Sequence, residues 1–265
     1  MWLHASSRLS FQISGPTPFV FALRPRNDPR QWVSREAFTP DPMVSVDEYT
    51  DVHGNRCQRL LAPPGPFTVV TMAEVETPET LDTAPGAPFI EIQDLPSEVL
   101  HYLLPSRYCE SEQFNHMARE IAGDAIPGYD QVARINDWVR RNVRFNPDSP
   151  YFQVSAVEVN RVREGVCRDL AHIGIALCRG LAIPARIVAG YLYELEPMDL
   201  HAWFEAYVGG AWYAFDPTQP APRGGRIILA AGRDAADVAT YSQFGPLIAP
   251  LDFTVSVEQI EAPAE

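Results

Sequence analysis

Alternation of apolar and polar residues dominates the first 76 positions of the chain. Leu9, Phe11 and Ile13 are separated by single polar residues, and several later runs show the same two-residue period. Because side chains two residues apart point to the same face of a strand, this pattern predicts half-buried β-strands. Prolines and glycines separate the runs and indicate turns. We therefore predict an N-terminal antiparallel β sandwich over residues 1–76.

The period of the pattern changes after a proline-rich stretch. Residues 77–96 contain four prolines, a composition typical of an extended linker. Beyond it, apolar residues recur at helical spacing, which predicts amphipathic helices. Helices are expected over residues 97–103, 111–121, 130–143 and 167–181, and strands over residues 185–193, 226–230 and 251–257. Helices packed on a mostly antiparallel sheet form an α+β domain, which we predict over residues 97–265.

A β-hairpin is predicted around Gly209-Gly210, because a two-residue Gly-Gly turn joins two strand-like runs, residues 201–208 and 211–216. The register of such a turn places Trp203 opposite Asp216. His201 lies two residues before Trp203 on the same face, so His201 and Asp216 are expected to be diagonal neighbours within side-chain reach. A three-residue loop would instead put them on opposite faces.

Cys167 lies where a glycine-containing loop passes into the long apolar helix predicted over residues 167–181. The unpaired N–H groups and partial positive charge at a helix start favour a thiolate, the nucleophilic form of cysteine. His201 would move the proton and Asp216 would fix the orientation of the imidazole. Each residue alone has a structural alternative: a core cysteine, a hydrogen-bonded histidine and a turn-forming aspartate. Their combination favours a thiol acyl-transfer site.

Motif residues of one known family recur in several runs: Leu103–Cys109, Gly165–Asp169, Ala176–Arg186, Gly190–Tyr191, His201–Glu205, Asp216–Thr218 and Gly232–Val238. They resemble the transglutaminase-like superfamily and, more closely, the bacterial transglutaminase-like cysteine protease group, which carries an N-terminal β domain. The resemblance covers most of the chain. It implies a papain-like catalytic core with the nucleophile at a helix N-terminus packed on an antiparallel sheet. It also implies Cys167 as nucleophile, His201 as general base and acid, and Asp216 as the residue that orients His201.

The donors of the oxyanion hole are only partly assigned by the sequence. The backbone N–H of Cys167 is the first candidate. Transglutaminases proper use a tryptophan upstream of the cysteine, but residues 144–166 contain none. Gln153 or Tyr151, in the loop before the site, could replace it. This departure from the family pattern weakens the case for a cross-linking enzyme.

Three further residues near the motif have both a functional and a structural interpretation. Trp203 and Glu205 share the predicted face of His201. Trp203 could shield the contact between His201 and Asp216 from water, and Glu205 could hydrogen bond around it, although structural support is the simpler role for both. His172 lies about 140° round the helix from Cys167 and is therefore poorly placed to act as its base.

Composition narrows the classes of function. A hydrophobic fraction of 46% in 265 residues suffices for a packed core, and a formal charge of −13 argues against nucleic acid or an anionic membrane as partner. The four cysteines and six histidines lack the spacing of metal or dithiol sites, so no metal or cofactor is expected. No signal peptide or membrane span is recognised, and the cytoplasm is the expected location. The oligomeric state stays open.

Three functional hypotheses follow from the sequence. The first is a cysteine-dependent enzyme that hydrolyses peptide or amide bonds: a protease, peptidase or amidase. The second is a protein-glutamine transglutaminase, which transfers the acyl group to an amine. The third is a non-catalytic binding module that keeps the Cys-His-Asp triad as scaffold. The sequence does not specify the peptide or amide substrate.

Overall fold

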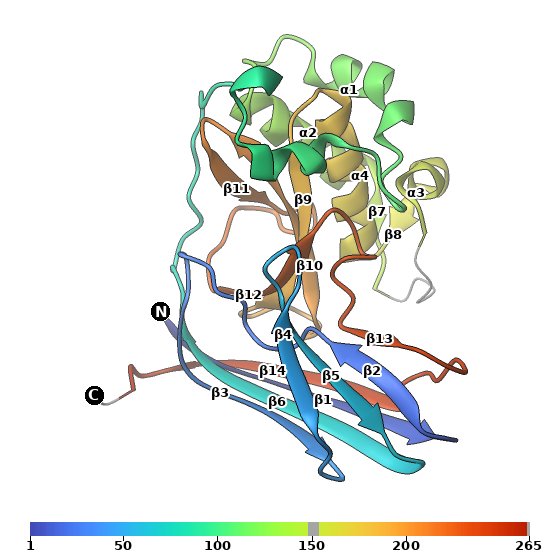
Figure 1. Cartoon of the computed structure of the whole chain (residues 1–265). Coiled ribbons are helices and arrows are strands. Elements are labelled where there is room, and N and C mark those ends of the chain that lie inside the picture. Colours follow the sequence, from blue (N-terminus) through green and yellow to red (C-terminus); the bar gives the residue numbers. More distant parts are fainter. Residues whose placement is uncertain (148–153, 264–265) are drawn as a thin grey trace.

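An antiparallel β sandwich forms one half of the molecule, and a third sheet covered by helices forms the other (Figure 1). The computed structural model describes residues 1–147 and 154–263. One sheet of the sandwich has the strand order β14-β1-β6-β3, and the other has the order β13-β2-β5-β4. The bounds of these strands are β1 Trp2–Ile13, β2 Thr17–Phe21, β3 Trp32–Asp41, β4 Val46–Thr50, β5 Arg56–Ala62, β6 Gly65–Glu76, β13 Tyr241–Gln243 and β14 Asp252–Ile260.

The core of the sandwich consists of the alternating residues that the sequence indicates. Every second side chain of β1 is buried from Leu3 to Ile13. Phe11 of β1 and Phe19 of β2 lie with their ring centroids 5.2 Å apart. Burial of aromatic side chains removes a large apolar area from water, so this cluster stabilises the packing of one sheet on the other.

The last two strands of the chain belong to the sandwich. Strand β14 runs antiparallel to β1, with Asp252 paired to Ser10 and Ile260 to Trp2. Strand β13 pairs in the same way with β2. The assignment of all residues from 97 to 265 to the α+β domain is therefore wrong for these strands. Alternation within a strand indicates which side chains are buried but not which distant strand it pairs with. The domain assignment followed the order of the sequence and was therefore wrong for these two strands.

The third sheet lies between the sandwich and the helices and has the order β11-β10-β9-β12 (Figure 1). Helix α4 packs on β10, where Gly174 lies against Phe204; a Cβ at position 174 would come 2.6 Å from a ring carbon. Only a residue without a side chain permits this close packing. The bounds of these elements are β9 Ala185–Leu192, β10 His201–Val208, β11 Ala211–Phe215, β12 Arg226–Gly232 and α4 Cys167–Gly180.

Shorter elements surround α4. The helix expected over residues 130–143 is α2, whereas the one expected over residues 111–121 is divided into a 3₁₀ turn, η3, and α1. None of the helices in the described residues is long and apolar enough to cross a membrane. The bounds of the shorter elements are η1 Ile92–Asp94, η2 Ser97–Leu103, η3 Ser111–Gln113, α1 Asn115–Ala122, α2 Tyr129–Asn142, β7 Arg144–Phe145, α3 Ala156–Val162 and β8 Glu164–Gly165.

The hairpin of β10 and β11 has the register predicted from its turn. Val208 pairs with Ala211, and Phe204 pairs with Phe215. Gly209 and Gly210 have φ angles of 58° and 89°, a backbone conformation that glycine adopts without steric cost. The prediction of a two-residue turn is therefore confirmed.

Side chains from the sandwich close the outer edge of β12. The side-chain amide of Asn55 donates to the carbonyl of Ala231 at 2.9 Å and accepts from its N–H at 2.8 Å. Gln31 makes the same pair of bonds with Ile228, at 2.9 and 2.7 Å. These two amides satisfy backbone groups that a further strand would otherwise pair with, and they fix the sandwich to the third sheet.

Candidate active site

Cys167 is the first residue of α4 and is half-buried. The turn before it is held by Asp169, which accepts a hydrogen bond from the N–H of Val166 at 3.1 Å and another from Arg168 Nε at 3.0 Å. A Cβ on Gly165 would lie 2.7 Å from Cβ of Asp169, so this contact requires glycine. The sequence thus places the thiol at an anchored helix start, where the first backbone N–H groups have no partner within the helix.

His201 and Asp216 meet beyond the hairpin, as the register predicts. Nε2 of His201 lies 2.7 Å from Oδ2 of Asp216, and both side chains are buried. The other carboxylate oxygen, Oδ1, accepts hydrogen bonds from the Thr218 hydroxyl at 2.7 Å and the Thr218 N–H at 3.1 Å. Arg226 Nη2 also donates to Oδ2, at 2.9 Å. The carboxylate is therefore held by donors on both oxygens.

These contacts set the protonation of the pair. Burial by itself disfavours the charged imidazolium, but the Asp216 carboxylate outweighs burial and raises the pKa of His201 to about 9. Burial would also raise the pKa of Asp216, but the charge and hydrogen bond of His201, followed by the charge of Arg226, hold it well below its usual range. At neutral pH the pair is thus a carboxylate and an imidazolium.

Cys167 and His201 line the same groove, which has a volume of about 510 Å³. Cys167 is close enough to His201 to raise its pKa further. Because Asp216 occupies Nε2, Nδ1 is the ring nitrogen left for the sulfur. Tyr241 of β13 and Phe253 of β14 also line the groove, so the sandwich contributes directly to it.

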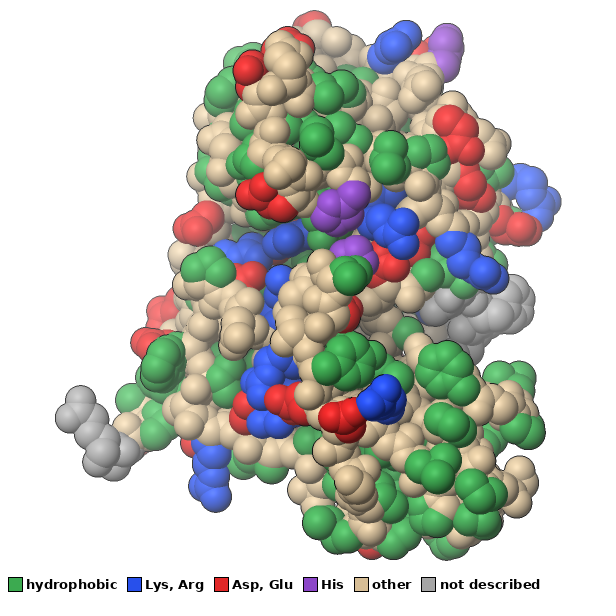
Figure 2. Space-filling view, viewed as in Figure 1, with side chains coloured by type: hydrophobic (Ala, Val, Ile, Leu, Met, Phe, Trp, Pro, Cys, Tyr) green, Lys and Arg blue, Asp and Glu red, His purple; other side chains and the backbone are tan. Residues whose placement is uncertain are grey.

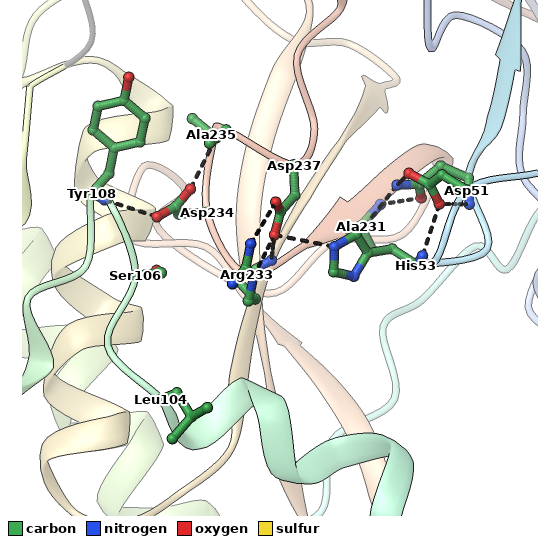
Figure 3. Close-up of polar contacts among 12 residues, drawn as sticks. Asp51, His53, Leu104, Ser106, Tyr108, Ala231, Arg233, Asp234, Ala235 and Asp237 are labelled. Carbon is green, nitrogen blue, oxygen red and sulfur yellow. Dashed lines mark hydrogen bonds and ion pairs between the residues drawn. The ribbon is translucent and has the colours of Figure 1, made fainter.

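The segment Gly232–Val238 lines this groove with Ala235 and Val238. It also reaches a turn of the sandwich, where Asp237 meets His53 (Figure 3). Asp234 accepts a hydrogen bond from the N–H of Tyr108 at 2.8 Å, and Asp237 lies 3.2 Å from Nε2 of His53, in the turn that follows β4. Arginine and histidine side chains gather at this junction between the two halves (Figure 2). Residues of the segment also line the groove, so its wall is fixed to both halves.

Trp203 lies beside the His201–Asp216 pair. Its ring is fully buried, with its centroid 6.1 Å from that of His201. The guanidinium of Arg226 lies over the indole at 4.7 Å. Trp203 therefore packs beside the pair in the buried interior, and its shielding of the pair from water stays a prediction.

Glu205 has another role than hydrogen bonding around the triad. It is fully buried, and its oxygens accept from Arg30 Nη1 at 2.6 Å and from Arg186 at 2.7 and 2.9 Å. Burial favours the neutral acid, but the charges of Arg186 and Arg30 outweigh it and lower the pKa of Glu205. Since Arg30 belongs to the loop after β2, Glu205 links the third sheet to the sandwich, which is the structural alternative considered for it.

Replacing Glu205 with glutamine is expected to lower the free energy of unfolding by about 3–5 kcal/mol, because two partly buried arginines lose the carboxylate of a fully buried glutamate. Urea denaturation followed by fluorescence measures the change. Glu158→Gln is the matched control, since Glu158 pairs with Arg161 on the exposed face of α3 and such pairs contribute little. Equal losses in the two variants would contradict a stabilising role for the buried pairs.

The structure describes one of the remaining candidate residues but not the other two. Tyr151 and Gln153 lie outside the described residues. His172 is completely buried, and its Nε2 accepts a hydrogen bond from the N–H of Ala235 at 3.1 Å. Burial lowers its pKa to about 3. His172 is thus a neutral structural residue, as its helical position indicates.

Sequence reasoning missed two residues that contact Asp216. Thr218 had a local signal, because an aspartate two residues before a threonine is typical of a turn in which the carboxylate accepts the backbone N–H. Arg226 had none. It comes from β12, which joins the sheet beside β9, and the turn chemistry of the hairpin does not report that neighbour.

Comparison with known proteins places this arrangement in a family. A solved protein from Cytophaga hutchinsonii, described as a candidate cysteine protease, matches all of this chain and 92% of its own chain at 34% identity, with a TM-score of 0.88. Residues 115–217 match the family described as the transglutaminase-like superfamily. This chain belongs to the transglutaminase-like superfamily. The family and the α+β class predicted from the sequence are confirmed.

Relatives of this transglutaminase-like chain occur in mycobacteria. An uncharacterized protein of Mycobacterium leprae is 28% identical over 234 residues, which cover 82% of each protein. An uncharacterized protein of Mycobacterium tuberculosis strain H37Rv is 34% identical over 96 residues, or 31% of each protein. The matched transglutaminase-like region contains Cys167, His201 and Asp216.

Proposed function

We propose that this transglutaminase-like chain is a cysteine-dependent hydrolase of peptide or amide bonds, with Cys167, His201 and Asp216 as its catalytic triad. The observation that carries the proposal is the 2.7 Å contact between His201 and Asp216, made by a histidine that lines the same groove as the helix-start thiol of Cys167. The likeness to a candidate cysteine protease over the whole chain supports it.

In the proposed reaction the sulfur of Cys167 attacks the carbonyl carbon of the amide, with His201 holding the thiol proton at Nδ1. The carbonyl oxygen becomes negatively charged and accepts a hydrogen bond from the Cys167 N–H. His201 then gives its proton to the departing amine as the C–N bond breaks, which leaves a thioester. Water attacks the thioester while His201 takes its proton, and the carboxylic acid leaves as the thiol is restored.

The test of the nucleophile is competitive alkylation of the four cysteines with iodoacetamide, read by peptide mass spectrometry. We expect Cys167 to react first. Burial raises the pKa of Cys57 and Cys178, and that of Cys109 to about 12, so these thiols stay protonated and covered. His201→Ala should slow the labelling of Cys167. Equal labelling of all four cysteines would contradict a catalytic role for Cys167 and favour a non-catalytic binding module.

A peptide and amide panel, incubated with and without a primary amine, tests the reaction type. Hydrolysis gives the free acid under both conditions. An amine adduct as the main product would instead identify a transglutaminase, since both reactions share the thioester and differ only in the nucleophile that attacks it. No cleavage and no adduct, together with unselective alkylation, would reject both enzymes.

A further inference from the structure

Arg226 contacts the same oxygen of Asp216 that His201 uses. It is the first residue of β12, and its side chain is only 5% exposed. Its Nη2 donates to Oδ2 of Asp216 at 2.9 Å, while Nε2 of His201 lies 2.7 Å from that oxygen. Two cationic donors therefore share one carboxylate oxygen in a buried site.

The arginine is fixed in this position from several sides. Its Nε donates to the carbonyl of Arg223 at 3.1 Å, and its Cζ lies over the Trp203 ring, 4.7 Å from the centroid. The hydroxyl of Thr77, the residue after β6, donates to the Arg226 carbonyl at 2.7 Å and holds the backbone. A planar group with this many contacts cannot swing away from the carboxylate without breaking them.

The bonds to Asp216 use the full capacity of its carboxylate. An ionised carboxylate has about four acceptor positions. Thr218 fills two on Oδ1, and His201 and Arg226 fill two on Oδ2. Thr218 brings no charge, whereas Arg226 is always cationic. Of the two residues that accompany His201, only Arg226 can weaken electrostatically the hold of Asp216 on the proton of His201.

We propose that Arg226 is a positioning residue of the active site: it fixes Asp216 through the oxygen that faces His201 and, by sharing that oxygen, limits how tightly Asp216 holds the proton on His201. This inference rests on the proposed function of the triad. Without Arg226, Oδ2 of the carboxylate would serve His201 alone, and the nearby positive charge that repels the imidazolium would be gone. The pKa of His201 would then rise, and His201 would become a weaker acid towards the departing amine.

The first measurement is a titration of the histidine rings by ¹⁵N NMR, with the His201 signal assigned by its loss in His201→Ala. We expect Arg226→Met to raise the pKa of His201 by about one unit. Arg226→Lys keeps a positive charge and should restore most of the value. Thr218→Val removes one uncharged hydrogen bond to Asp216, together with the 3.5 Å contact between that hydroxyl and Nε2 of His201, and should shift the pKa of His201 by less than about half a unit.

Arg179→Met separates positioning from stability. Arg179 is equally buried, but it donates to carbonyls, among them that of Ala185 at 2.9 Å, and lies outside the triad. Its replacement should lower the midpoint of thermal unfolding and leave the titration of His201 unchanged. Arg226→Met should lower both the midpoint and kcat, the latter by about 10–100-fold with little change in KM, because substrate contacts are retained.

Chemical rescue provides an independent measurement. A small cavity of about 50 Å³ already lies against Arg226 and is also lined by Trp203 and Glu205. Within the described residues, Nη1 of Arg226 and Nε1 of Trp203 are buried without a hydrogen-bond partner. Arg226→Ala enlarges this cavity, so added guanidinium should restore part of kcat and return the titration of His201 towards the wild-type value.

The two proposals fail in different ways. If Cys167 is not selectively alkylated and no amide is hydrolysed, the proposed function fails, but the NMR titration still reports whether Arg226 acts on His201. If the wild type hydrolyses amides and Arg226→Met leaves both the titration and kcat unchanged, the inference about Arg226 is wrong. A change in the pKa of His201 in Arg179→Met as large as that in Arg226→Met would also overturn the inference about Arg226.

Discussion

Replacing Cys167 with alanine is expected to reduce kcat/KM for peptide or amide hydrolysis by about 10⁶-fold, the order seen when a covalent nucleophile is removed. The reason is that the thioester can no longer form, while the His201–Asp216 pair has no other thiol within the groove. Steady-state kinetics on a substrate found with the panel measures the loss, and circular dichroism checks that the variant is folded.

Cys178→Ala is the control for the loss of a cysteine from the same helix. Cys178 is completely buried in α4 and lies outside the groove. Its replacement should leave a small cavity that lowers the stability, while kcat/KM stays at the wild-type level. Activity of Cys167→Ala close to that of the wild type would refute a covalent mechanism on this residue.

Replacing Asp216 with asparagine is expected to reduce kcat by about 10⁴-fold, as the imidazole loses the carboxylate that fixes its tautomer and orientation. The pH dependence should change as well. Asp216 raises the pKa of His201 from 6.5 to about 9, so without it the imidazolium is lost at lower pH. The alkaline limit of activity should therefore move down, and a pH–rate profile of kcat/KM measures it.

The same substitution should change how stability depends on pH. A group whose pKa is higher in the folded state stabilises it fully below the unfolded value of 6.5, and this contribution disappears as the pH rises through about 9. The wild type should thus lose stability between these values, and Asp216→Asn should lose much less. Asp252→Asn, on the exposed face of β14, serves as a control that should leave both profiles unchanged.

Much of the site could be predicted because its elements are local in sequence. The two-residue turn at Gly209-Gly210 fixes the register of the hairpin, and the register places His201 and Asp216 together. Cys167 could be placed at a helix start because the apolar spacing of α4 begins there. The family motifs and the predicted turn indicate the same residues. The short segment from Cys167 to Asp216 was therefore sufficient to predict the candidate site.

The parts that could not be predicted depend on contacts between distant segments. Strands β13 and β14 show ordinary alternation, but their partners β2 and β1 lie more than 200 residues away. Arg226 reaches Asp216 because β12 joins the opposite side of β9, which no turn determines. The strand position of Glu205 suggests that it is a neighbour of His201. Its carboxylate pairs instead with Arg30, which belongs to a loop of the sandwich.

The closure of β12 by Asn55 and Gln31 has a consequence for the half that contains the third sheet, taken on its own. A fragment that begins after residue 96 would lack both amides and would present a row of open backbone donors and acceptors. Such a row is a template on which a second polypeptide can add a strand, and fragments of this kind tend to aggregate. By covering this edge, the sandwich prevents self-association of the sheet that carries His201.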